Sequence, residues 1–135
     1  MWTIHKHTER CYKFFEDQTT WVQARERCED LQLPNPDLAS IQDSQTNKLL
    51  QGLTEDEGGM RPTTWVGAHL EGCFKDGNWM WTDGSPWAVL NPSPWAPGIP
   101  GIYYGDLALG LNAYGEFWAP LSEWSEYPRI CQYEP

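Results

Sequence analysis

The sequence predicts an α+β domain in which two helices flank short antiparallel sheets and a long irregular loop. Apolar residues recur at helical spacing twice in the first half, whereas the stretches 11–18, 63–70, 78–84 and 127–133 are rich in aromatic and β-branched residues. Helices and strands that do not alternate regularly are typical of the α+β class. With 135 residues, the chain has the length of a single domain covering residues 1–135.

The first helix is expected directly after the strand at 11–18. Thr19 or Thr20 can cap it, since a hydroxyl accepts a hydrogen bond from a free N–H of the first turn. Its core face is marked by residues three and four apart, namely Trp21, Ala24, Cys28 and Leu31. Prolines at 34 and 36 end the helix, and LASI (38–41) follows as a short strand or a bend.

A second helix is predicted over residues 43–53, where Asp43 or Ser44 is the cap, Leu49, Leu50 and Leu53 face inward, and Gly52 lies near the end. An acidic, glycine-rich loop comes next and is interpreted as a solvated surface. The stretches 63–70 and 78–84 then form a hairpin with 71–78 as its turn. Period-two alternation places Trp79 and Trp81 on one face of it.

Residues 85 to about 116 follow neither helical nor strand spacing and form the predicted long loop. Five prolines stiffen it, at 86, 92, 94, 97 and 100. Its tryptophans, tyrosines and aliphatic residues are not typical of a disordered segment. An irregular stretch of this length in a compact domain is usually functional.

Charge and cysteine usage narrow the classes of partner. Nineteen acidic residues against nine basic ones give a net charge of −10, which disfavours nucleic acid and anionic membranes. No apolar run reaches the roughly 20 residues that span a bilayer, so membrane insertion is not expected, and the first residues lack the apolar centre of a secretion signal. The four cysteines show no zinc spacing and are interpreted as disulfides, which predicts a secreted, extracellular protein.

The motifs, in order, are CY-x-FF, TTW…A…C, LASI…N, WVGA, WxWTDGSP, WAPGxP and a terminal IC. This series resembles the C-type lectin-like domain over the whole chain. The resemblance implies an α+β fold, a Cys28–Cys131 disulfide, and a long loop that forms the binding edge.

The calcium-binding positions of that family are occupied differently here. Where sugar-binding members carry Glu-Pro-Asn and Trp-Asn-Asp, this chain has Ile99-Pro100-Gly101 and Trp118-Ala119-Pro120. Calcium takes six to eight oxygen ligands, and Ile, Gly, Ala and Pro offer no side-chain oxygen. We therefore predict no metal site and no cofactor, with calcium association at most weak and diffuse on the acidic surface.

Two further features follow from the resemblance. The family's second disulfide would join positions near Asp106 and Glu123, where this chain has no cysteine, and Pro100 matches a cis proline. For Cys11, pairing with Cys73 is favoured. The alternatives are a partner upstream of this chain, as in the longer family form, and a free or intermolecular thiol.

Candidate ligand-binding residues lie in or beside the long loop: Trp87, Trp95, Tyr103, Tyr104, Glu116 and Trp118. The aromatic side chains either stack on a ligand or pack on one another in place of the missing disulfide. Trp65, Trp79 and Trp81 are assigned to the core. His5 and His7 are interpreted as an exposed N-terminal coincidence and His69 as an ordinary strand residue.

No arrangement of nucleophile, base and acid has catalytic spacing, so the chain is predicted not to be an enzyme. The leading hypothesis is an extracellular or biomineral matrix module, similar to the lectin-like domains of spicule matrix proteins. The alternative is recognition of a carbohydrate or protein by the aromatic loop, and an ordinary calcium-dependent lectin comes third. The expected partners are accordingly a glycan, a matrix protein or a calcium mineral.

Overall fold

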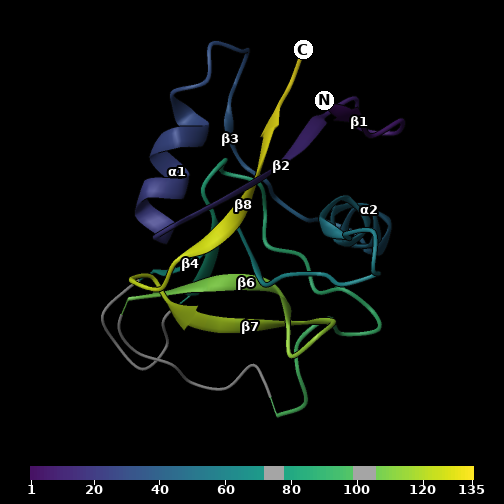
Figure 1. The fold of residues 1–135 in the computed structure, drawn as a ribbon, viewed down its shortest axis with the longest axis vertical. Helices are drawn as coiled ribbons and strands as arrows, with labels where there is room; N and C mark the ends of the chain where they lie inside the picture. The colour runs from purple at the N-terminus through teal and green to yellow at the C-terminus, as the bar shows by residue number, and fades with distance from the viewer. Residues whose placement is uncertain (72–77, 99–105) are drawn as a thin grey trace.

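Two helices and a mixed sheet make up the described part of the chain in a computed structural model that covers residues 1–71, 78–98 and 106–135 (Figure 1). The elements in chain order are β1 (Thr3–Ile4), β2 (Cys11–Thr19), α1 (Trp21–Glu29), β3 (Asp37–Leu38), α2 (Ser44–Thr54), β4 (Thr64–Glu71), β5 (Asn78–Trp81), β6 (Leu107–Ala113), β7 (Phe117–Ser122) and β8 (Tyr127–Tyr133). The predicted α+β class is confirmed.

Both helices begin at a capping residue that the sequence offered. Thr20 accepts a hydrogen bond from the Gln23 N–H, and the Gln23 side chain accepts one from the Thr20 N–H, which completes a capping box. Asp43 caps α2 by accepting from the Thr46 N–H at 2.7 Å. The predicted core face of α1 is buried at Trp21, Ala24 and Cys28, whereas Leu31 lies beyond the end of the helix.

The strands follow the order β1-β2-β8-β4-β6-β7, with β3 paired to β8 and β5 paired to β4. Only β4 and β8 run parallel among these pairs. In Figure 1, α1 and α2 lie to either side of β2 and β8. The two termini lie at one end of the molecule, and β6 and β7 lie toward the other.

Two core tryptophans with satisfied ring N–H groups and one disulfide link the elements around the core. The Trp65 N–H donates to the Thr19 carbonyl at 3.0 Å, and the Trp21 N–H donates to the Val66 carbonyl at 2.9 Å. Cys28 of α1 and Cys131 of β8 form the predicted disulfide, with their Cα atoms 5.4 Å apart. This bond ties the first helix to the last strand.

The irregular stretch is shorter than the predicted 85–116, because residues 107–113 form β6. Six of the seven residues of this strand are buried, so its sequence LALGLNA shows no alternation of polar and apolar residues. A Cβ atom on Gly110 would lie 2.3 Å from Leu121 Cδ1, so the Leu121 side chain of β7 occupies the space that a side chain here would need. Strands buried on both faces lack the period-two signal.

Cys11 is a free and buried thiol, so the favoured Cys11–Cys73 pairing is wrong in this structure. Cys11 begins β2 opposite Tyr133 of β8, and β8 separates β2 from β4, the strand that leads toward Cys73. Cys73 itself lies outside the described residues. The structure thus has the free thiol of the third alternative, and an upstream or intermolecular partner stays a prediction.

One of the two N-terminal histidines differs from expectation, whereas His7 is exposed as predicted. His5 is buried, at 6% exposed, and its backbone is held in a turn in which its N–H donates to the Arg10 carbonyl and its carbonyl accepts from the Glu9 N–H. Its Nδ1 accepts a hydrogen bond from the His7 N–H at 3.2 Å. His69 is a half-buried residue of β4 that stacks on Trp21, with ring centroids 4.8 Å apart.

Candidate binding site at the long loop

Five tryptophans pack together where the long loop meets the sheet. Trp79 and Trp81 project from one face of β5, as the alternation predicted, and Trp87 and Trp95 of the loop lie against them. Ring centroids are 5.2 Å apart for both Trp79–Trp95 and Trp81–Trp87, and Trp118 of β7 lies 5.6 Å from Trp95. The loop is therefore anchored by aromatic packing.

Backbone hydrogen bonds join the same loop to β7. The Ala96 N–H donates to the Trp118 carbonyl at 3.0 Å, and the Trp118 N–H donates to the Pro94 carbonyl at 2.8 Å. The ring N–H of Trp118 donates to Asn47 Oδ1 of α2 at 2.8 Å. One residue thus connects the loop, β7 and α2.

A hydrogen bond also joins the positions of the missing family disulfide. The Glu123 N–H donates to the Asp106 carbonyl at 2.9 Å, next to the β6–β7 pair Leu107 and Ser122. The two positions are therefore neighbours, as the resemblance implied. The main-chain hydrogen bond between Glu123 and Asp106, together with the packing of the five tryptophans, fixes the loop in place of a disulfide.

The candidate ligand-binding residues fall into three groups. Trp118 is 1% exposed, so its ring belongs to the core and has no face open to a ligand. Trp87 and Trp95 are half-buried, and Glu116 is exposed in the turn between β6 and β7. Tyr103 and Tyr104 lie outside the described residues, as do Ile99-Pro100-Gly101 and the predicted cis bond before Pro100.

The structure has a cis peptide bond at Asn91–Pro92, within the same loop. Beside it, a hollow of about 160 Å³ lies among the loop residues from Trp87 to Trp95 and reaches Trp118. Its walls are mostly apolar, formed by Leu90, Pro94 and the tryptophan rings. It is smaller than the few hundred Å³ of a typical ligand pocket.

A larger cleft, here called the α2–loop cleft, lies between α2 and the long loop and has a volume of about 410 Å³. Its walls are Ser44, Asn47, Lys48, Gln51, Leu90–Pro94, Glu116 and Phe117. Gln51 donates from its amide to the Glu116 carbonyl at 2.9 Å, which fixes one end of the cleft. Amide, hydroxyl and charged groups therefore face proline and phenylalanine surfaces across one space.

Sequence reasoning found Glu116 but missed the α2 wall of this cleft. The polar residues Ser44, Asn47, Lys48 and Gln51 recur at three- and four-residue spacing, which is one face of a helix. That spacing was the available signal. The polar face was hard to recognise because one of its members, Gln51, is only 7% exposed and lies next to the buried Leu50, at the boundary with the core face.

A separate polar network joins β8 to the segment after β5, to the segment after β3 and to the residue before β2. Asp83 accepts hydrogen bonds from the Ser40 hydroxyl at 2.5 Å and the Gln132 amide at 2.9 Å, and Arg10 lies 3.6 Å away. Burial alone would raise the pKa of Asp83, but the hydrogen bonds from Ser40, Ser85 and Gln132 outweigh it and hold the pKa below its ordinary value. The network is self-satisfied and so braces the fold.

No group of three or more His, Cys, Asp or Glu side chains in the described ranges is arranged to hold a metal ion. At the family's second calcium position, Ala119 is buried and Pro120 half-buried on β7. Neither helix of the described chain is long and apolar enough to cross a membrane.

The sequence is 30% identical over 132 residues to a lectin from Pleurodeles waltl, an alignment that covers 94% of this chain and 72% of that protein. The chain belongs to the C-type lectin-like domain family. It is also 33% identical over 124 residues to the C-type mannose receptor 2 of Mus musculus, covering 90% of this chain but only 8% of the receptor. No family model matches the sequence.

Among solved structures, the domain is similar to a calcium-independent type II antifreeze protein. The TM-score is 0.78 at 24% identity, and the match covers 98% of this chain and 91% of that one. This likeness concerns the fold. Together, the relatives and the fold make the protein a lectin-like binding module.

Proposed function

We propose that this C-type lectin-like domain is an extracellular, non-catalytic recognition module that binds a neutral glycan in the α2–loop cleft without calcium. The observation that carries the proposal is the composition of that cleft. It combines the ring of Phe117 and the proline surfaces with the polar groups of Asn47, Lys48 and Glu116. A sugar ring presents an apolar face and a rim of hydroxyls, which such walls can match.

The absence of side-chain oxygens at Ala119 and Pro120 supports calcium independence. A bound calcium ion would need six to eight oxygen ligands, and β7 supplies none from these two side chains. The antifreeze neighbour is described as calcium-independent and has the same fold, so the fold itself does not require the ion. The disulfide between Cys28 and Cys131 supports an oxidising, extracellular location.

The test is a glycan array probed with the domain in chelator, followed by calorimetric titration of any sugar that binds. Glu116→Gln and Lys48→Met are expected to weaken binding about tenfold, because each loses a charge-assisted hydrogen bond. Glu126→Gln is the matched control, since Glu126 is also exposed but lies between β7 and β8, outside the cleft. Binding that needs calcium, or that is equally weakened by the control, would contradict the proposal.

A role in an extracellular or biomineral matrix is the second candidate, and the charge of the chain favours it. Nineteen acidic residues against nine basic ones give an excess of carboxylates over cations, suited to a calcium mineral or its ions. This role predicts weak, multiple calcium association that physiological salt removes, because exposed charges are screened within about 8 Å. A single stoichiometric site that survives salt would instead return the chain to the calcium-dependent lectins.

A further inference from the structure

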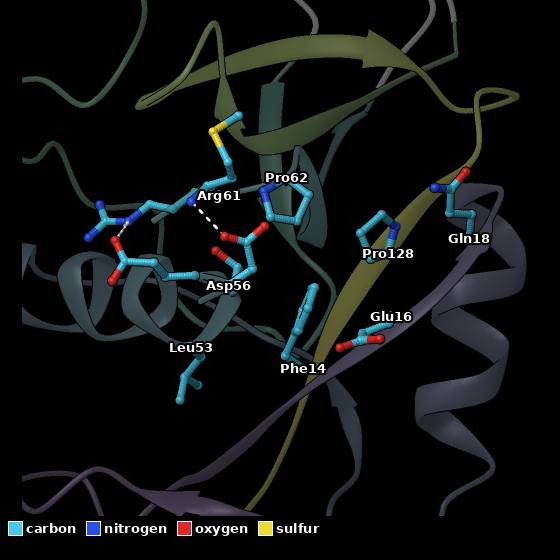
Figure 2. Close-up of a pocket in the computed structure, with 11 residues that line it drawn as sticks. Phe14, Glu16, Gln18, Leu53, Asp56, Arg61, Pro62 and Pro128 are labelled. Atoms are coloured by element: carbon cyan, nitrogen blue, oxygen red, sulfur yellow. Dashed lines mark hydrogen bonds and ion pairs between the residues drawn. The ribbon is translucent and has the colours of Figure 1, made fainter. Parts of the chain in front are cut away.

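A second groove, of about 510 Å³, lies away from the long loop, between β2, β8 and the segment that follows α2 (Figure 2). Its apolar surface comes from three separate elements: Phe14 of β2, Leu53 of α2 and Pro128 of β8. Figure 2 shows these side chains around one open space, with Pro62 on the opposite wall, and Met60 is a further lining residue. We call this feature the acidic groove, for the residues at its rim.

The rim carries three carboxylates and one cation. Glu16, Glu55 and Asp56 are exposed, and Arg61 is already paired with Glu55, with Nε and Oε1 3.2 Å apart. Asp56 accepts hydrogen bonds from the N–H groups of Gly58 and Met60, so it orders its own loop while its charge remains at the groove. The groove is therefore net negative.

One feature of the apolar part, the exposed Met60, suits a protein ligand. Met60 is 69% exposed, and an exposed, flexible Met side chain is typical of surfaces that adapt to a partner. Where β2 lines the groove it bulges: Phe15 pairs with Arg129 and Thr19 with Tyr127, so three residues of β2 face Pro128 alone. Pro128 has no N–H to donate to this bulge.

We propose that the acidic groove binds an exposed segment of a partner protein in which arginine or lysine residues alternate with aliphatic ones. The aliphatic stem of a lysine or arginine can lie along Phe14 and Leu53 while its charged end reaches Glu16 or Asp56. A cation above the ring of Phe14 gains further from cation–π attraction. The net charge of −10 steers a basic segment toward the domain and repels nucleic acid and anionic membranes.

This inference is independent of the glycan proposal, because the acidic groove and the α2–loop cleft share none of the lining residues that the described parts of the chain supply. The probe is a capped peptide of alternating arginine and leucine, titrated into the isotope-labelled domain while the amide NMR shifts are followed. We expect shifts confined to residues 14–18, 53–62 and 127–129. A peptide with glutamate in place of arginine should produce none.

Two variants and two matched controls decide the assignment. Glu16→Lys and Met60→Ser should each weaken peptide binding about three- to tenfold, by reversing one exposed charge and by removing one apolar contact. Glu26→Lys on α1 and Met80→Ser on β5 make the same changes at exposed positions outside the groove and should leave the affinity unchanged. All four residues are at the surface, so the variants are expected to fold.

Shifts centred elsewhere, or no binding at millimolar peptide, would overturn the proposal. So would an equal loss with Glu26→Lys, because that would show attraction to the overall charge alone. Loss with Glu16→Lys and Met60→Ser but not with their controls would support it.

Discussion

Removing the Cys28–Cys131 disulfide should destabilise the domain by about 5 kcal/mol. The two cysteines are 103 residues apart in sequence, and the chain-entropy model assigns about 4.7 kcal/mol to closing a loop of roughly this size in the unfolded state. The change to make is the double substitution Cys28→Ala and Cys131→Ala. Since a domain of this size is stable by about 5–15 kcal/mol, the variant should fold only marginally at physiological temperature.

The assay is urea unfolding followed by tryptophan fluorescence, with the free energy of unfolding extrapolated to water. Cys11→Ala is the matched control, because Cys11 is also buried, at 7% exposed, but closes no loop. It should cost only about 1 kcal/mol, the value of a small buried side chain. If the double variant loses no more than twice what Cys11→Ala loses, the unfolded-state argument fails.

Three further changes test the packing, the polar network and the loop. Gly67→Ala should lower the free energy of unfolding by about 1–3 kcal/mol, because the new Cβ would lie 3.1 Å from Leu38 Cβ. Thermal or urea unfolding measures this loss, and an unchanged stability would show that β4 can shift. The depressed pKa of Asp83 means that its ionised form stabilises the fold above the unfolded value near 3.8, and this contribution is lost as pH falls through the folded value. Asp83→Asn should therefore cost stability at neutral pH and progressively less in acid. A loss that does not change with pH would show that the depressed pKa contributes nothing to stability. Trp95→Ala should lower the free energy of unfolding by about 2–4 kcal/mol, since the Trp95 ring packs on three other tryptophans. If stability is unchanged and ligand binding is lost, Trp95 is instead a residue that stacks on the ligand.

The sequence predicted those features that depend only on residues close together in the chain, such as helix caps and the buried face of a helix. The start of α1 follows from a Thr cap, and its buried face follows from residues three and four apart, so both were predictable. The Cys28–Cys131 disulfide needed the family resemblance, because spacing alone leaves its partner open. β6 was missed because a strand covered on both faces carries no alternation.

The environment of Cys11 could not be predicted because it depends on strand order. A hairpin of β4 and β5 is evident from the sequence, but the position of β8 between β2 and β4 is set by long-range pairing. The same limit applies to the candidate site. The α2–loop cleft needs the path of the loop past α2, and the contact between Asn47 and Trp118 joins residues 71 apart.

The arrangement around Trp118 explains how a loop without its family disulfide can still present a binding surface. Its backbone pairs with Pro94 and Ala96 of the loop, and its ring N–H reaches Asn47 in the opposite wall of the cleft. Both walls of the α2–loop cleft are therefore positioned by one buried residue that is not among the residues lining the cleft. A disulfide between positions near Asp106 and Glu123 would clamp only the base of the loop, whereas this arrangement also fixes the loop relative to α2. The loss of the covalent clamp is thus compatible with a preformed cleft, in which the ligand would incur little cost for ordering the loop.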